Sequence, residues 1–217
     1  MKTKYHIDLT KKALSEHFSS EALNTIITAN IHQDRIKYQF GHDYIHFDGN
    51  AFSEGFEYIN SQKLIIIESV SAEDYQAALR ALGRMTHSWQ DFYSHSNYVK
   101  LWCEKEKKSN PEDINFNDKE ILTRSALKSG KNYGIIEFLA FIPMISNLVF
   151  PLMPEDSHAR MNLDSPSSGK FFSFAYCAAL KRTRHVYKQI LLLLNRNDIA
   201  TNKIRSFHNK STVEVKV

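Results

Sequence analysis

Apolar residues recur at helical spacing through nearly the whole chain, which leaves few fold classes open. With only 7 Gly and 5 Pro in 217 residues, glycine-rich nucleotide loops and disordered linkers are disfavoured. We therefore predict an all-α, single-domain multi-helix bundle. Helices are expected from Asp8 or Thr10 to Phe18, from Ser19 to Asp34, over 52–70 (where 64–67 alone could form a strand), over 71–95, over 118–128, and from Ser165 to about Leu194.

The most informative segment lies in the helix expected over 71–95. His87, Asp91 and His95 are spaced at i, i+4 and i+8, so a helix places them on one face. The neighbouring Trp89, Phe92 and Tyr93 predict that this helix is buried on most sides. A buried carboxylate between imidazoles is costly unless a metal ion or a partner neutralises it. The pattern therefore favours a metal site on a central helix, and a hydrogen-bonded core network is the alternative.

Further polar residues fall where additional ligands would be needed. Asp34 shares a helix face with apolar residues and should point inward, and His6 begins the first helix. His46 and Asp48 lie on one side of the chain if that segment is extended. His158 and Asp164 form a late cluster with Asn162. Together these residues are enough for more than one metal ion.

At this point the residues resemble a known family. One string is similar to the signature of the heterokaryon-incompatibility C-like proteins: it runs from Leu82-Gly83 through His87-Ser88-Trp89-Gln90-Asp91-Phe92-Tyr93-Ser94-His95 to Val99. These proteins belong with the zinc-dependent phospholipases C and the fungal three-zinc single-strand nucleases. Weaker similarities lie at 5–10, at Ala29-Asn30 with Asp34, at 46–48 and at 162–165. The resemblance implies a zinc-dependent phospholipase C-like helical fold with a metal cleft holding two or three zinc ions.

The resemblance also implies a role for each residue. His87 and Asp91 would match the central His-x-x-x-Asp, with Asp91 bridging two ions; Asp34 and His46 would complete the first site. His6 would serve the ion that shares Asp91, and His95 and His158 would serve the third.

Two features depart from the family pattern. The secreted enzymes use the mature N-terminal residue as a zinc ligand, whereas here five residues precede His6. The late acid expected at position 162 is Asn162, for which Asp164 is the expected substitute.

Such a site would hydrolyse a phosphodiester by metal-activated water. Asp91 would bridge the ions, and Asp34 or Asp48 would act as general base. Arg160 or a lysine of the basic tail would hold the phosphate. The expected substrate is a phosphate-containing small molecule or a phospholipid, and nucleic acid enters only through the nuclease branch of the resemblance.

Two other function classes stay open. A non-catalytic scaffold or interaction protein would keep the fold and a structural metal, as Asn162 and the unusual N-terminus favour. Another His/Asp metalloenzyme, such as an HD-type phosphohydrolase or a di-iron oxygenase, is suggested by the doublet His42-Asp43. Metal content separates these classes, because a zinc hydrolase should hold two or three zinc ions.

The remaining predictions concern organisation. Residues 1–195 are expected to form one α-helical metal-binding domain and 196–217 a basic, loosely ordered tail, since nine Lys and Arg face two acids from Lys181 onward. The apolar segment 135–153 is expected to form a buried, kinked helix pair, with membrane-surface contact or a partner interface as alternatives. No signal peptide is predicted, so the protein is expected in the cytoplasm or exported by a non-classical route.

Overall fold

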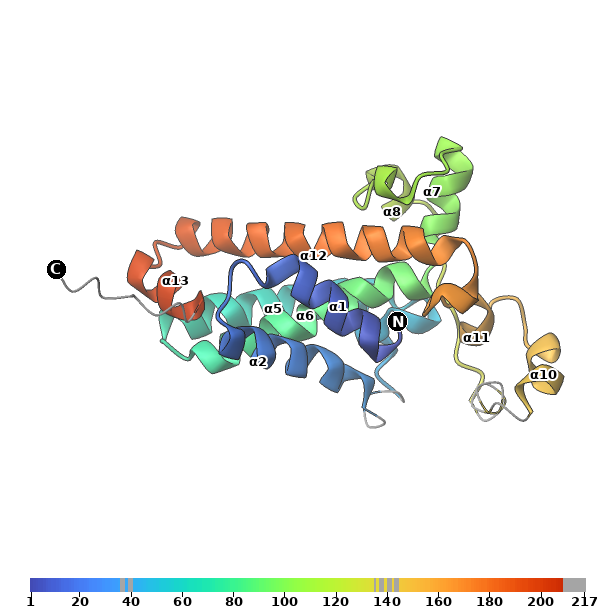
Figure 1. Cartoon of the computed structure of the whole chain (residues 1–217), viewed down its shortest axis with the longest axis horizontal. Helices are drawn as coiled ribbons and strands as arrows, with labels where there is room; N and C mark the ends of the chain where they lie inside the picture. The colour runs from blue at the N-terminus through green and yellow to red at the C-terminus, as the bar shows by residue number, and fades with distance from the viewer. Residues whose placement is uncertain are drawn as a thin grey trace.

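The all-α prediction is confirmed by a computed structural model of the chain. The model describes residues 1–35, 38, 41–134, 136, 139, 142 and 145–208. Within these residues every regular element is helical, and only two isolated β-bridges occur, Ser96 with Ser129 and Lys131 with Ser157. Figure 1 shows a long bundle in which α12 runs along one side, and α7 and α8 stand above one end of it.

The α-helices are α1 (Thr3–Leu14), α2 (Ser20–Ile31), α4 (Asp43–His46), α5 (Phe52–Ser71), α6 (Tyr75–His95), α7 (Tyr98–Glu106), α8 (Lys119–Leu122), α10 (Ser146–Val149), α11 (His158–Met161), α12 (Phe171–Arg196) and α13 (Thr201–His208). Short 3-10 turns are η1 (His32–Asp34), η2 (Asp48–Asn50), η3 (Pro111–Asp113), η4 (Phe150–Leu152) and η5 (Pro166–Ser168).

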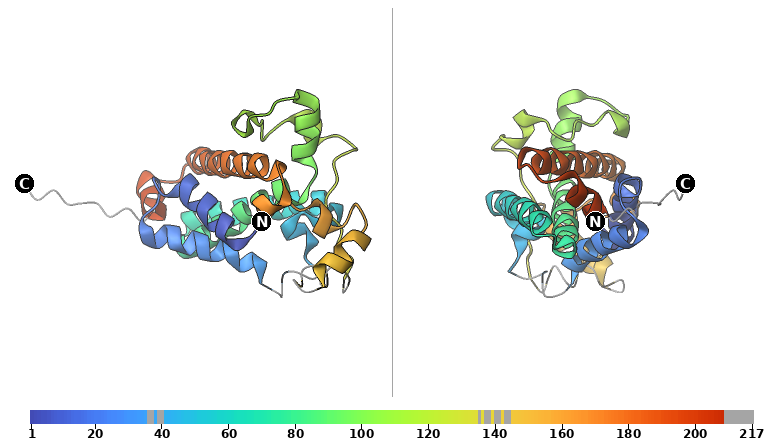
Figure 2. Two further views of the ribbon diagram at one scale, coloured as in Figure 1. Left: turned by 45° about the vertical axis from the view of Figure 1, so that its right-hand side comes forward. Right: turned by 90° about the vertical axis from the view of Figure 1, so that its left-hand side faces the viewer.

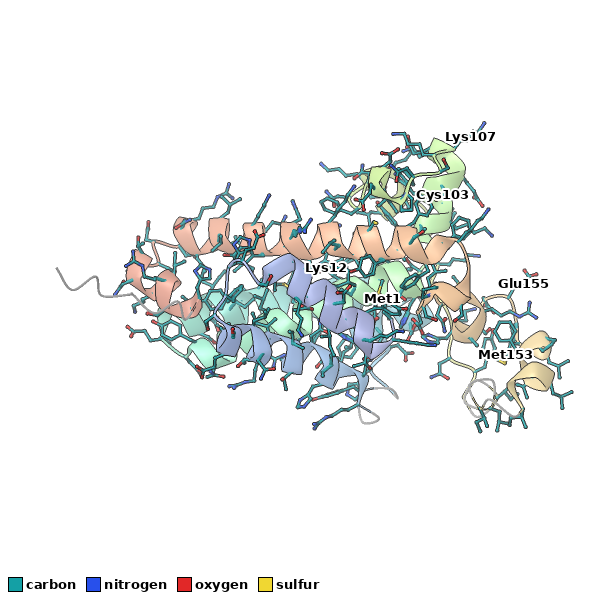
Figure 3. The ribbon with its side chains drawn as sticks, in the orientation of Figure 1. Met1, Lys12, Cys103, Lys107, Met153 and Glu155 are labelled. Carbon is teal, nitrogen blue, oxygen red and sulfur yellow. The ribbon has the colours of Figure 1, made fainter. Side chains whose placement is uncertain are left out.

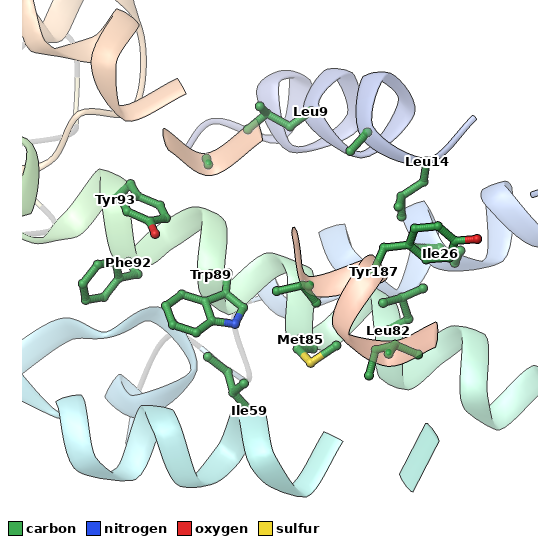
Figure 4. Close-up of a cluster of buried hydrophobic side chains, with 14 of the residues drawn as sticks. Leu9, Leu14, Ile26, Ile59, Leu82, Met85, Trp89, Phe92, Tyr93 and Tyr187 are labelled. Atoms are coloured by element: carbon green, nitrogen blue, oxygen red, sulfur yellow. The ribbon is translucent and has the colours of Figure 1, made fainter. Parts of the chain in front are cut away.

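Helix α6 is the central element of the bundle. It packs against α2, α5 and α12, which surround it in the end-on view of Figure 2. Every residue from Met85 to His95 is buried, as the aromatic flanks of the motif predicted. The apolar side of α6 presents Leu82, Met85, Trp89 and Phe92 to the core shown in Figure 4. Its other side carries the polar residues that form the site.

Helices α2 and α6 cross at very short range at Gly83. A Cβ on Gly83 would lie 2.3 Å from the backbone oxygen of Ile26 and 2.9 Å from the Cβ of Ala29. A glycine is needed there because backbone atoms of a neighbouring helix cannot move aside as the end of a side chain can. This crossing sets the distance between the end of α2, which leads into Asp34, and the polar side of α6.

Helix boundaries follow the predictions in part. Helix α2 begins after Ser19, whose hydroxyl accepts a hydrogen bond from the backbone N–H of Ala22 at 3.2 Å. Helix α6 begins only at Tyr75, because the carboxylate of Asp74 caps it. The expected helix over 118–128 is a single turn, α8, and α12 begins at Phe171, because Gly169 breaks the chain with φ = 97° after η5.

The predicted tail is partly helical. Helix α13 packs on the bundle through Phe207, whose side chain is fully buried. Within the segment expected to be loosely ordered, 201–208 thus form a helix, and residues 209–217 lie outside the described residues. The division into one domain and a tail stays a prediction.

The apolar segment 135–153 lies partly outside the described residues, since 135, 137, 138, 140, 141, 143 and 144 are not among them. In its described part the expectation of a buried helix pair is wrong. Leu148 is 76% exposed and Leu152 is 78% exposed, whereas Met153 is buried. Figure 2 shows that the piece carrying α10 projects from the end of the bundle.

None of the helices that the structure describes is both long enough and apolar enough to cross a bilayer.

The close crossing at Gly83 predicts that Gly83→Ala destabilises the fold, although alanine is the better helix former by about 1 kcal/mol. The added methyl group must push α2 away from α6, so we expect a net loss of about 1–3 kcal/mol in the free energy of unfolding, measured by urea denaturation. The control is Gln76→Ala, an exposed position of the same helix. Unchanged stability of Gly83→Ala would show that the two helices are not in contact there.

Candidate metal centre

The polar side of α6 faces a set of histidines and carboxylates from several other elements. His87, Asp91 and His95 come from α6, as their spacing predicted. His6 comes from α1, Asp34 from η1, His46 from α4, Asp48 from η2 and His158 from α11. Two groups within this set bring their donor atoms within 4.8 Å of one another: His6, Asp34, His87 and Asp91 in the first, and Asp48, His95 and His158 in the second.

The first group is centred on Asp91. Its Oδ2 atom lies 2.9 Å from His46 Nδ1 and 2.9 Å from His87 Nε2. The two imidazole nitrogens are 3.2 Å apart, and His87 Nε2 is 3.7 Å from Asp34 Oδ1. The donor atoms of a tetrahedral zinc ion, with ligand distances of about 2.0–2.1 Å, lie about 3.3 Å from one another. These four separations are close to the spacing that such an ion requires, and they add His46 as a neighbour of the first group.

The other oxygen of Asp91 faces the N-terminal segment. The α-amino group of Met1 lies 2.6 Å from Asp91 Oδ1 and 3.1 Å from Asp164 Oδ1, and His6 Nε2 lies 3.2 Å from Asp91 Oδ1. Figure 3 shows Met1 at the start of α1, toward the end of the bundle that carries α11. Met1 was not among the residues predicted for the site, and the five residues ahead of His6 are the signal that could have pointed to it.

The ring of His6 is oriented by a neutral amide. Its Nδ1–H donates a 2.6 Å hydrogen bond to Oε1 of Gln90, which also accepts a 3.1 Å hydrogen bond from the amide of Asn30. With the proton on Nδ1, the lone pair of Nε2 is left on the side of Asp91. Metal-binding histidines in proteins are held in the same way, by a hydrogen bond from the second ring nitrogen.

The second group is centred on Asp48. Its Oδ1 atom lies 3.0 Å from His158 Nδ1 and 3.1 Å from His95 Nδ1. Asp164, the expected substitute for an acid at position 162, instead accepts a hydrogen bond from Ser94 Oγ at 2.9 Å and lies 3.4 Å from His95 Nε2. The carboxylate nearest to both imidazoles of this group is thus Asp48.

The segment 46–48 is not extended, contrary to the expectation that put His46 and Asp48 on one side. Helix α4 ends at His46, and Phe47 takes a left-handed conformation with φ = 59°. The turn sends the two side chains to different groups, His46 to Asp91 and Asp48 to His158. The aromatic ring of Phe47 is buried against Phe56 and Phe92, which holds the turn in place.

Burial and mutual charge shift the acidities of the site. Burial alone would raise the pKa of Asp91. The charges of the Met1 ammonium and of His87 outweigh burial and hold this pKa well below its usual range. Burial lowers the pKa of His87 to about 4 despite the charge of Asp91. Burial also opposes the charge of the Met1 amino group, but Asp164, Asp91 and Asp34 outweigh it and raise that pKa to about 11.

The donor set fits a divalent cation. Imidazole nitrogens and carboxylate oxygens are ligands that zinc takes in proteins. His6 Nε2, His46 Nε2 and Asp34 Oδ2 are buried and make no hydrogen bond with the described residues. His6 Nε2 is near Asp91 but does not point along a hydrogen bond to it, so a lone pair on this atom remains available. Unpaired buried polar atoms are costly, and coordination of an ion would remove that cost at His6 and Asp34.

Other residues singled out in the sequence lie elsewhere. The guanidinium of Arg160 donates to the backbone oxygen of Pro151 at 2.7 Å and lies over the ring of Phe150, so it is engaged within its own loop. Asp43, of the His42-Asp43 doublet, begins α4, and the doublet contributes to neither group of donors.

The fold and the site together define a helical protein with a buried cluster of histidines and aspartates. In sequence, the chain matches the model of the VWA7 N-terminal domain over residues 3–123, which is more than half of its length. The chain belongs to this family. The matched region contains His6, Asp34, His46, Asp48, His87, Asp91 and His95.

The relatives are much longer proteins. The chain is 32% identical over 80 residues to von Willebrand factor A domain-containing protein 7 of Rattus norvegicus and, at the same identity and length, to that of Homo sapiens. Each match covers 37% of this chain and 9% of the relative. No solved structure matches the chain significantly.

The hydrogen bonds of Gln90 predict that Gln90→Leu destabilises the protein whether or not a metal is bound. Leucine has a similar size but leaves the Nδ1–H of His6 without its acceptor, and we expect a loss of about 1–3 kcal/mol in the free energy of unfolding, measured by urea denaturation. The matched control is Gln76→Leu on the exposed side of the same helix, with a change within about 0.5 kcal/mol. Equal effects of the two variants would mean that Gln90 does not orient His6.

Proposed function

We propose that the chain is a metal-dependent phosphodiester hydrolase of the zinc-dependent phospholipase C and three-zinc nuclease type. The observation that carries the proposal is the convergence of His46, His87 and His6 on the two oxygens of one buried carboxylate, Asp91. A carboxylate that meets donors on both oxygens is suited to bridge two cations. Divalent ions bound there would lower the pKa of a water molecule and neutralise phosphate charge.

The chain's own residues would divide the remaining work. Asp91 would hold two ions at a fixed separation, and Gln90 would keep His6 turned toward them. Asp34 is the partly exposed carboxylate of the first group, at 27% side-chain exposure. It is therefore the residue best placed to orient water and accept its proton, the role of general base. Asp48, the other carboxylate suggested for this role, is surrounded by His95 and His158 and is better suited to bind an ion.

The alternatives named from the sequence remain as outcomes of metal analysis. About one zinc ion per chain, or none, with no turnover would support a scaffold or interaction protein with a structural metal. Iron or manganese would support another His/Asp metalloenzyme.

The apolar segment 135–153 favours a lipid as the substrate. Ile136, Leu148, Phe150 and Leu152 of this segment are exposed, and no Asp, Glu, Lys or Arg occurs from 138 to 154. Apolar side chains that project from the end of the bundle suit contact with a membrane surface through 135–153. A phospholipid would then meet the metal centre from the surface on which the protein rests.

The bridging role of Asp91 predicts the metal content of two forms of the protein. Wild-type protein should hold two or three zinc ions per chain by elemental mass spectrometry and hydrolyse bis(4-nitrophenyl) phosphate. Asp91→Asn should lose most of the zinc and the activity together, because the neutral amide cannot bridge two cations. The matched control is Asp74→Asn, the exposed cap of the same helix. Full zinc content in Asp91→Asn would contradict the bridging role.

The geometry of the second group predicts which acid serves the third ion. Asp48→Asn should lower the zinc content by about one ion per chain and leave the ions that share Asp91 in place, because Asp48 contacts only His95 and His158 among the histidines. Asn162→Ala changes the position where the zinc-dependent phospholipase C pattern has an acid, and this variant should leave the zinc content unchanged. The reverse result, with zinc lost from Asn162→Ala and kept in Asp48→Asn, would rule out Asp48 as a ligand.

A further inference from the structure

A second site of distinct chemistry lies between α2 and α6. It is a cavity of about 300 Å³, separate from the two groups of metal donors. Its wall is built from the end of α2, the η1 turn and the middle of α6; the residues that line it include Thr25, Thr28, His32, Gln33, Arg80 and Arg84. The volume suits a small polar group rather than a whole lipid.

The wall of this cavity is cationic. Arg80 and Arg84 are one helical turn apart on α6, and two like charges at this spacing destabilise a helix. No aspartate or glutamate is among the residues that line the cavity. Of the remaining lining groups, the Thr25 hydroxyl donates to the backbone oxygen of Glu21 at 3.2 Å and the Gln33 amide donates to Tyr58, so the two arginines are the groups that would hold an anion. Such a wall is suited to an oxyanion.

One of the two guanidinium groups is held in place. Arg84 is half-buried, and its Nε–H donates a 2.7 Å hydrogen bond to Oε1 of Gln62 on α5. Gln33 is buried and donates a 3.0 Å hydrogen bond to the hydroxyl of Tyr58, also on α5. Because both residues are tied to α5, the terminal nitrogens of Arg84 are positioned before any ligand binds. An arginine held in this way loses less entropy when it forms the paired hydrogen bonds that suit a phosphate.

The cavity adjoins the metal centre through the backbone. Gln33 directly precedes Asp34, and Arg84 lies one turn before His87 on α6. Both pairs of neighbours belong to rigid elements that the crossing at Gly83 holds together. Two lining residues of the cavity thus lie on the same elements as two donors of the first group, Asp34 and His87.

We propose that this cavity binds a phosphate group of a ligand, through the guanidinium groups of Arg80 and Arg84. If the proposed function is correct, on which this second step rests, the bound group is a non-reacting phosphate of the substrate. The substrate then carries a phosphate beside the diester that is cleaved, as a phosphorylated nucleotide or a phosphorylated inositol headgroup does.

The binding step is tested with pyrophosphate as the probe, by isothermal titration calorimetry on the full chain. Arg80→Gln/Arg84→Gln should bind pyrophosphate at least about tenfold more weakly than wild type, because two charge-assisted contacts are lost. The matched control is Arg184→Gln, which removes one exposed guanidinium from α12 and should leave the affinity unchanged. Arg80→Lys/Arg84→Lys, which keeps the charge, should bind with intermediate affinity.

The same titration on Asp91→Asn separates this proposal from the metal centre. Binding that survives in Asp91→Asn and is lost in Arg80→Gln/Arg84→Gln supports the cavity, even if the protein proves to hold no zinc. Binding that is lost in Asp91→Asn and kept in the arginine variant would place the anion on the metal ions and overturn the proposal. Equal affinity of wild type, Arg80→Gln/Arg84→Gln and Arg184→Gln would overturn it as well.

The substrate step has its own kinetic test. We compare 4-nitrophenyl diesters of a nucleotide or an inositol headgroup with and without one additional phosphate. The additional phosphate should lower KM in wild type and have no effect on KM in Arg80→Gln/Arg84→Gln, with zinc content equal in both. A preference that is the same in both proteins would exclude the cavity as the substrate's second contact, and the stronger of the two substrate series identifies the source of the phosphate.

Discussion

The carboxylate of Asp91 lies within the continuous buried stretch of α6 from Met85 to His95, and its negative charge must be compensated inside the protein. An uncompensated charge in such a place costs several kcal/mol. Each oxygen meets its own set of partners: His46 and His87 on Oδ2, and the amino group of Met1 and His6 on Oδ1. His87 lies on α6 itself, whereas α1 and α4, which are distant from α6 in sequence, bring His6 and His46 to it, and Met1 directly precedes α1. Much of the bundle's arrangement can be understood as enclosing this one charge.

Charge and orientation are supplied by different residues. The ionisable groups compensate one another around Asp91, whereas neutral amides set their directions. Gln90 is adjacent to Asp91 in sequence but points to α1 and α12, where its amide donates to the hydroxyls of Thr10 and Thr183 at 3.3 Å. Asn30 donates to both Thr86 and Gln90. This hydrogen-bonded layer is fully buried, so the positions of the histidines depend on contacts that carry no net charge.

The sequence predicts well what a single helix determines. The stripe of His87, Asp91 and His95 and its burial follow from helical spacing and aromatic neighbours. It predicts poorly what depends on turns and on distant contacts. The left-handed φ at Phe47, which divides His46 from Asp48, falls on a bulky residue, and the Asp48-Gly49 pair signals a turn without showing that it begins at Phe47. The place of Met1 depends on how α1 packs, and the pairing of Asp48 with His158 joins residues 110 positions apart.

The buried ring of Phe47 has a consequence for both groups of donors. This residue lies between His46 and Asp48, and its ring packs so closely against α5 that a Cβ on Gly55 would lie 2.6 Å from it. The packed ring of Phe47 thus fixes the backbone between His46 and Asp48, and with it the spacing between the two groups of donors. Any motion of α5 relative to α6 would move both centres through this ring. His46 and Asp48 are therefore expected to move together when α5 moves, although they belong to different groups of donors.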